Sequence, residues 1–136
     1  MEALPAWAVD DPTLEGAVRL LRRVPNLLVH DGVIESTCFD ERTLGTGLSV
    51  TAWRSPSDLE DIRRFHEHFG VVCVEAARFR ALGAIVAAAP LIGNLNHYEV
   101  FPRLSSSPRK KLKAAARWVH YPDWVLPEHR QPIEQF

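Results

Sequence analysis

The sequence predicts an α+β fold, in which one compact domain combines a mixed β-sheet with about three to four helices. Three observations predict this class. The chain has 136 residues, the length of one ordinary domain. Short segments with the two-residue period of β-strands recur along it, and helix-start signals occur between them at irregular intervals. We expect the domain to span 11–120, between an N-terminal arm at 1–10 and a proline-rich tail at 121–136.

The first third of the domain contains strand-like segments and a turn signal. Asp11-Pro12 resembles a helix start, and residues 17–24 either continue that helix or form a strand. Asp31-Gly32, placed between apolar residues, predicts the tight turn of a hairpin. Residues 48–53 alternate between apolar and polar side chains, which predicts a half-buried strand.

The clearest helix signal follows at 55–69. Ser55 can cap its N-terminus, Asp58 stands at the capping-box position, and apolar residues recur at helical spacing until Gly70. Residues 71–74 are continuously apolar and mostly β-branched, which is typical of a central strand.

The remaining elements are short until the last helix. Residues 76–82 predict a helix ended by glycine, 84–87 a further strand, and 97–101 a strand reached through a turn-rich connection. A final amphipathic helix is expected from Ser107-Pro108 onward. It carries a basic row, so we expect the fold to end in a basic amphipathic C-terminal helix.

Composition limits the classes of function. The chain is 46% apolar and 24% charged with a formal net charge of −1, so no general basicity directs it to nucleic acid or to an anionic membrane. Two cysteines, Cys38 and Cys73, do not make a disulfide framework or a metal cluster, and we expect buried free thiols. With no leader-like or membrane-length apolar segment, the sequence predicts a soluble cytoplasmic protein.

The densest group of polar, reactive side chains is in the segment 93–101. If 97–101 is a strand, His97 and Glu99 share one face and Tyr98 lies on the other. A carboxylate can orient an imidazole for acid–base catalysis, and the amides of Asn94 and Asn96, with Tyr98, could position a polar ligand. The alternative is an edge strand in which the asparagines serve only the turn.

Two basic groups offer sites for an anion. Arg22 or Arg23 would need a carboxylate or phosphate partner if its strand directs it inward, whereas on a helix both would be solvated. The last helix carries a basic row at helical spacing, which could dock a phosphate-bearing partner or simply face solvent. This row consists of Arg109, Lys113 and Arg117, with Lys110 and Lys111 beside it.

Other chemistries lack their signatures. Residues 47–51 do not match the G-x-S-x-G turn of a nucleophilic serine. His66 and His68 stand two apart on the predicted helix, which points them in different directions and does not suit a shared metal. No metal and no cofactor is predicted.

Several segments together resemble, in the same order, a set of small uncharacterised bacterial proteins. The resemblance spans 18–118 and implies a compact bacterial domain in which the arginine-rich start and the histidine-containing strand recur. It implies no activity. The matching segments are residues 21–24, 31–32, 39, 47–50, 80–83 and 94–100.

Three functional hypotheses follow. The first is a small cytoplasmic bacterial accessory or regulatory protein that binds a protein partner, as an immunity-like or effector-associated subunit; Trp7 and Trp124 near the ends of the chain would suit interface anchors. The second is an enzyme acting on a phosphate-containing small molecule or nucleic acid, with His97 and Glu99 as the acid–base pair and an arginine clamp. The third is nucleic-acid binding through the basic helix.

Overall fold

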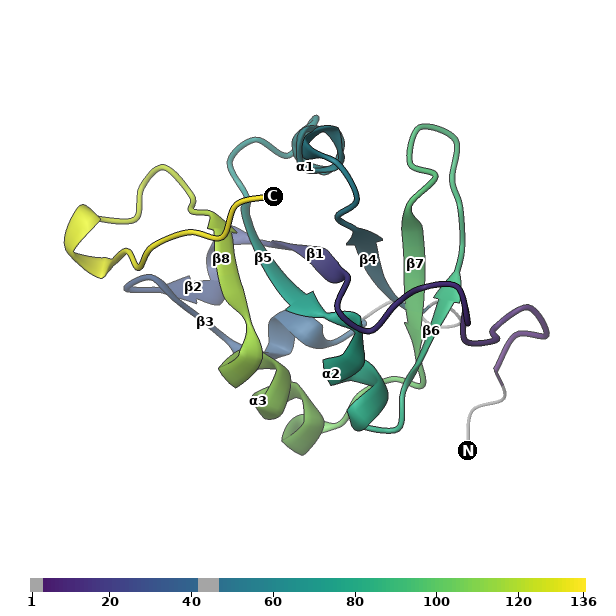
Figure 1. Cartoon of the computed structure of the whole chain (residues 1–136). Helices are drawn as coiled ribbons and strands as arrows, with labels where there is room; N and C mark the ends of the chain where they lie inside the picture. The colour runs from purple at the N-terminus through teal and green to yellow at the C-terminus, as the bar shows by residue number, and fades with distance from the viewer. Residues whose placement is uncertain (1–3, 42–46) are drawn as a thin grey trace.

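A six-stranded sheet organises the computed structural model, which describes residues 4–41 and 47–136 (Figure 1). The predicted α+β class and single compact domain are confirmed. The expected sheet was mixed, but every pairing between the described strands of this sheet is antiparallel. In spatial order the strands are β6 (Ile85–Ala88), β7 (His97–Phe101), β4 (Leu48–Ala52), β1 (Arg19–Val24), β5 (Gly70–Glu75) and β8 (Arg117–His120).

A separate two-stranded hairpin joins β2 (Val29–His30) to β3 (Val33–Ile34). Asp31 and Gly32 connect them with φ angles of 51° and 78°. Positive φ at both central residues is the geometry that two-residue hairpins prefer, and Asp-Gly adopts it readily. The predicted turn is therefore confirmed.

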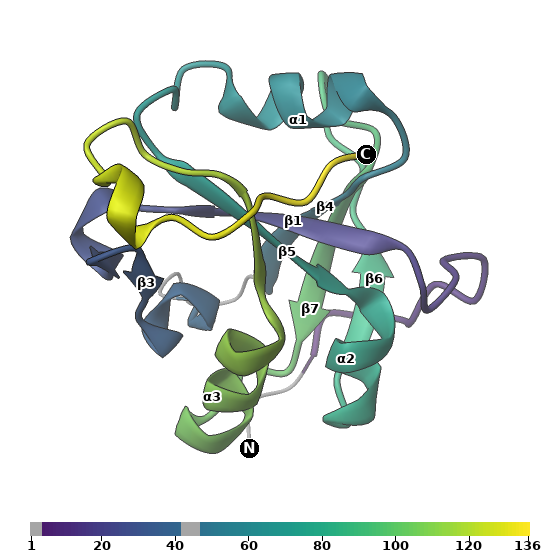
Figure 2. The ribbon, with the colours of Figure 1, turned by 60° about the vertical axis from the view of Figure 1, so that its left-hand side comes forward.

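Helices cover both faces of the six-stranded sheet. Figure 2 shows α1 (Pro56–Arg63) on one face and α2 (Ala76–Ala81) and α3 (Ser106–Ala115) on the opposite face. Three short 3₁₀ turns complete the fold: η1 (Asn26–Leu28), η2 (Ser36–Phe39) and η3 (Pro127–His129).

Alternation along the strands creates two cores. Even-numbered residues of β1, including Leu20, face α2, α3 and η2, and pack with Phe39, Phe79 and Leu112. Odd-numbered Leu21 faces the other way, into a smaller core under α1. Because strand side chains have a period of two, each strand contributes to both layers.

Three predicted elements differ from those observed. Asp11 starts no helix: its Oδ1 accepts hydrogen bonds from the backbone and hydroxyl of Thr13, as an N-cap would, but the chain forms only turns there. The helix expected over 55–69 ends at Arg63, since Phe65 takes a left-handed conformation with φ 65° and is 90% exposed instead of facing the core. The last helix ends at Ala115, so Arg117 belongs to β8.

Segments outside the sheet engage its two outer strands. The backbone N–H of Asp11 donates to the Val86 carbonyl on β6 at 2.9 Å, and the backbone N–H of Glu134 donates to the Trp118 carbonyl on β8 at 2.7 Å. Tyr121 and Val125, within the predicted tail, are buried against the main core. Among the described residues, no helix combines the length and the apolar character that crossing a membrane requires.

Candidate functional site

The segment His97–Phe101 forms the predicted strand, β7. Because side chains alternate along a strand, the predicted site residues lie on two faces of the sheet. His97 pairs with Thr51 of β4, and Glu99 pairs with Ser49, on the face that α1 covers in part. Tyr98 lies on the opposite face, within the main core. The strand therefore directs Tyr98 away from the imidazole and the carboxylate.

The His97 ring is held by backbone rather than by a carboxylate. Its Nδ1 lies 2.8 Å from the Ala89 carbonyl oxygen, and the residue is 8% exposed. A carbonyl can only accept, so Nδ1 carries the proton and in the neutral ring Nε2 is the basic nitrogen. No described residue hydrogen-bonds Nε2.

Glu99 and Arg22 are each engaged elsewhere. Glu99 Oε1 accepts a hydrogen bond from the Gly47 backbone N–H at 2.8 Å. Arg22 donates to the carbonyl oxygens of Cys38 and Ser49, both at 2.9 Å, and burial lowers the pKa of its guanidinium. Glu99 therefore does not orient His97, and Arg22 joins η2 to the sheet.

Arg23 faces the same side of the sheet as His97. Its guanidinium donates to the Ile62 carbonyl near the end of α1 at 3.2 Å, and burial lowers its pKa. Arg23 and His97 line one groove of about 470 Å³ between α1 and the β6–β7 connection, with Thr51 and Asn94 also in its lining. We refer to this as the α1–hairpin groove.

The two asparagines build the groove. Asn94 Nδ2 donates to the Thr51 hydroxyl at 3.0 Å, and Asn96 Nδ2 donates to Asp58 Oδ1 at 2.9 Å. Asp58 is buried at the start of α1, where its Oδ2 also accepts the backbone N–H groups of Arg54 and Ser55, each at 2.8 Å. These bonds fix α1 and the β6–β7 connection relative to each other.

Tyr98 belongs to a separate polar network. Its hydroxyl donates to Asp11 Oδ2 at 3.0 Å and accepts from Arg54 Nη2 at 2.8 Å. Burial and the hydrogen bond to Asp11 raise the pKa of Tyr98. The hydroxyl is thus committed to a contact within the fold.

Large apolar side chains project beside the α1–hairpin groove. Phe65 follows α1, and Ile92 and Leu95 lie on the β6–β7 connection; their exposed fractions are 90%, 107% and 80%. The connection ends in a tight turn, in which Leu91 and Asn94 exchange two backbone hydrogen bonds of 3.0 Å. The exposure of these residues was not predicted, although three large apolar residues in a turn-rich segment, Leu91, Ile92 and Leu95, indicate it in the sequence.

The basic row predicted on the last helix is divided. Arg109 pairs with Asp40 at 3.3 Å, and Lys113 lies half-buried toward η2. Lys110 is exposed, and Arg117 lies on β8. Because the helix ends at Ala115, the four residues do not form one face of it.

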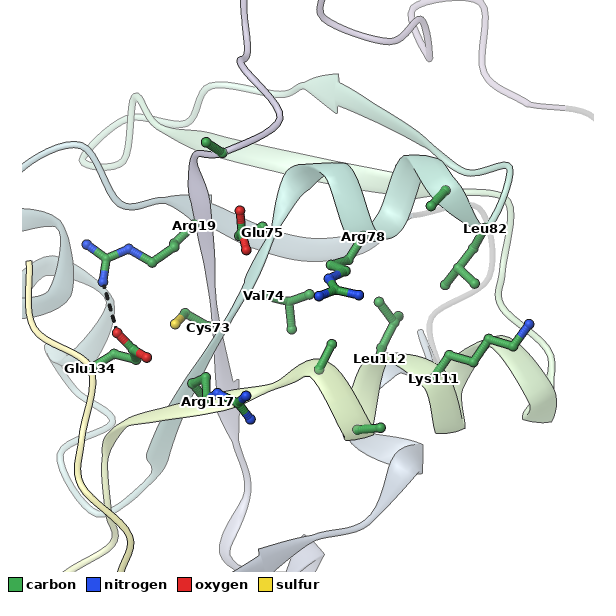
Figure 3. Close-up of a pocket in the computed structure, with 14 residues that line it drawn as sticks. Arg19, Cys73, Val74, Glu75, Arg78, Leu82, Lys111, Leu112, Arg117 and Glu134 are labelled. Atoms are coloured by element: carbon green, nitrogen blue, oxygen red, sulfur yellow. Dashed lines mark ion pairs between the residues drawn. The ribbon is translucent and has the colours of Figure 1, made fainter.

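A second groove of about 870 Å³ lies between α2 and α3, at the end of β5 (Figure 3). We refer to this as the α2–α3 groove. Arg78 of α2, Lys111 of α3 and Arg117 of β8 line it, together with the buried thiol of Cys73, whose pKa burial raises to about 11. Of the three cations, Lys111 and Arg117 belong to the basic row predicted from the sequence, whereas Arg78, which shares the short helix α2 with Arg80, was not predicted.

The four tryptophans divide between core and surface. Trp53 is buried, and Trp118 is partly buried against the main core, stacked on Tyr121 with ring centroids 4.4 Å apart. Trp7 and Trp124 are about half exposed, at 49% and 48%.

Within residues 4–41 and 47–136, no group of three or more His, Cys, Asp or Glu side chains could hold a metal ion. No protein-family model matches the chain, and no curated protein and no solved structure is significantly similar to it.

Proposed function

We propose that the protein acts by binding a protein partner, as an accessory or regulatory subunit, and that the α1–hairpin groove with its apolar margins is the binding surface. The observation that carries this proposal is the near-complete exposure of Phe65, Ile92 and Leu95. Exposed apolar patches of this kind mark interaction sites on folded proteins. Burial of each such side chain by a partner would contribute about 1.5–3 kcal/mol.

The groove is suited to a partner because its parts are held in place before binding. The amide of Asn96 bonds Asp58, and that of Asn94 bonds Thr51, so binding would not need to order the β6–β7 connection. A preformed surface loses less conformational entropy on association. Polar groups of Arg23 and His97 between the apolar margins could then select among partners.

The location proposed for this activity is the cytoplasm. Cys38 and Cys73 are both buried free thiols. Free thiols are the usual state of cysteine in reducing compartments.

The proposal is tested by comparing two serine variants in affinity capture, one double and one single. The first replaces Ile92 and Leu95 by serine; the second, the matched control, replaces Leu27, which is 87% exposed on η1 and does not line the groove. Proteins retained from an extract of the source cells would be purified, and their Kd for each variant measured by calorimetry. We expect at least about a tenfold weaker Kd for the groove variant, corresponding to about 1.4 kcal/mol, and no change for the control.

The proposal fails if no retained protein binds the purified chain directly. It also fails if the Ile92/Leu95 variant binds as tightly as the unmodified protein. Loss of binding in the Leu27 variant alone would assign the interface to another surface.

A second candidate is catalysis on a phosphate ester in the same groove. The specific observation in its favour is that the Ala89 carbonyl fixes the His97 ring with Nε2 as its basic nitrogen, in a groove that also contains Arg23. Nε2 could take a proton from an attacking water while Arg23 binds the phosphate oxygens. Glu99 has no part in this mechanism, because its carboxylate accepts a hydrogen bond from the Gly47 backbone N–H.

The test of this candidate is hydrolysis of p-nitrophenyl phosphate and bis-p-nitrophenyl phosphate. We expect His97→Gln and Arg23→Gln each to lower the rate at least about a hundredfold. Arg64→Gln is the control, because Arg64 lines the groove but pairs with Asp61 at 3.1 Å. Absence of turnover, or turnover unaffected by His97→Gln, removes the candidate.

A further inference from the structure

The α2–α3 groove lies where one edge of the sheet is left uncovered. β8 pairs with β5 through Trp118 and Arg117, and the last pair is Arg117 with Cys73. Val74 and Glu75 therefore have a strand partner in β1 but none in β8. An unpaired strand edge can accept an added extended segment.

Cations surround this uncovered edge. Figure 3 shows Arg78, Lys111 and Arg117 entering the groove from α2, α3 and β8. All three are exposed, and none has a side-chain hydrogen bond or ion pair to any residue in the described part of the chain. Of the two acids in the groove, Glu134 pairs with Arg19, which leaves Glu75 against three unpaired cations.

One end of the groove already holds a segment of this chain that brings one carboxylate, that of Glu134. The Glu134 backbone N–H donates to the Trp118 carbonyl at 2.7 Å, and its carboxylate lies 3.6 Å from Arg19 Nη1. Arg19 Nη1 also donates to the Gln135 carbonyl at 2.8 Å. This segment therefore makes both a backbone hydrogen bond to the sheet edge and an ion pair between the Glu134 carboxylate and Arg19.

We propose that the α2–α3 groove binds an extended, acidic segment of a protein, laid along the end of β5. Its carboxylates would pair with Arg117, Arg78 and Lys111. Small side chains on the groove wall, Ala81 and Ala114 among them, let a backbone approach closely. Alternate residues of an extended chain lie about 6.6–6.8 Å apart on one face, which suits acids alternating with small apolar residues. This surface shares no lining residue with the α1–hairpin groove.

The probe is a fluorescein-labelled peptide of alternating alanine and glutamate, seven residues long, whose binding is followed by fluorescence anisotropy at low salt. Arg78→Gln, Lys111→Gln and Arg117→Gln should each weaken its Kd about two- to fivefold, the range of exposed ion pairs. Lys110→Gln is the matched control, since Lys110 is the exposed neighbour of Lys111 on α3 but does not line the groove. Glu75→Gln should have the opposite effect and tighten binding, because it removes the competing acid.

Each remaining outcome overturns the inference. Undetectable binding does so, as does equal binding of a peptide with glutamine in place of glutamate. If Lys110→Gln weakened the Kd of the peptide as much as Lys111→Gln, the peptide would be responding to the net charge of the protein and not to the groove. Displacement of the peptide by an equal concentration of inorganic phosphate would show a small-anion site in place of a peptide site. Thermal melting of every variant checks that the fold is retained.

Discussion

Replacing Asp58 by alanine removes the group that joins α1 to the β6–β7 connection. Asp58 is 6% exposed, and its carboxylate accepts three hydrogen bonds of 2.8–2.9 Å, from the backbone N–H groups of Arg54 and Ser55 and from the Asn96 amide, and a longer one of 3.3 Å from the Ser55 hydroxyl. Its loss leaves the start of α1 without this cap and the Asn96 amide without this acceptor. Both margins of the α1–hairpin groove therefore depend on one side chain.

The magnitude follows from the kind of bonds lost. Hydrogen bonds to a charged group contribute about 1.5–3 kcal/mol, and loss of a helix cap costs about 0.5–2 kcal/mol. Because the two backbone bonds are themselves the cap, these figures overlap. We expect Asp58→Ala to lower the free energy of unfolding by about 2–4 kcal/mol, a large part of the stability of a small domain.

Equilibrium unfolding in urea measures this loss. Asp61→Ala is the control on the same helix; Asp61 forms a surface pair with Arg64, so we expect less than about 1 kcal/mol. A double-mutant cycle between Asp58 and Asn96 should give a coupling of about 1 kcal/mol. A loss for Asp58→Ala no larger than that for Asp61→Ala, or no coupling to Asn96, would refute the role assigned to Asp58.

Three further predictions concern titratable groups. The hydrogen bond from Arg103 lowers the pKa of Asp40 below 3.8. The ionised Asp40 therefore stabilises the fold fully above about pH 4, and this stabilisation is lost as the pH falls through the pKa of the folded state. Asp40→Asn should remove this part of the fall in unfolding free energy at low pH, measured by urea titration at a series of pH values. His97→Ala should lower the free energy of unfolding in urea by about 1–3 kcal/mol, because the hydrogen bond to Ala89 is lost. In the unmodified protein, nitrogen NMR of the neutral ring should show the proton on Nδ1; a proton on Nε2 would contradict the assigned tautomer. Burial raises the pKa of Cys38 to about 12 and that of Cys73 to about 11, so both thiols should react slowly with Ellman's reagent at neutral pH and rapidly after unfolding in guanidinium.

Local signals identified most of the strands. The alternation in 48–52 and 97–101 and the apolar run at 71–74 each became a strand, because their patterns match the two faces of a buried sheet. Where local preference and tertiary contacts disagree, the contacts decide. Residues 114–116 are three alanines, the best helix formers, yet the helix ends at Ala115 and the chain turns into β8 to pair with β5.

The candidate site was less predictable because its hydrogen bonds join residues far apart in the chain. Period two correctly put His97 and Glu99 on one face, but nothing local indicates that Glu99 bonds Gly47, 52 residues away. Arg22 and Arg23 are adjacent, yet the strand turns one toward Cys38 and the other toward Ile62. The exposure of Phe65 also escaped prediction, since no glycine marks the end of α1.

The contacts of Asp11 with Val86 and of Glu134 with Trp118 affect how the molecule meets other chains. An outer strand with free backbone groups invites another copy to add on and begin an aggregate. Here polypeptide from the same molecule already bonds to each outer strand, which disfavours stacking of copies edge upon edge. Beside Val74, where β5 has no partner in β8, the groove is lined by positive charge, so a chain that adds its backbone there is selected for acidic side chains.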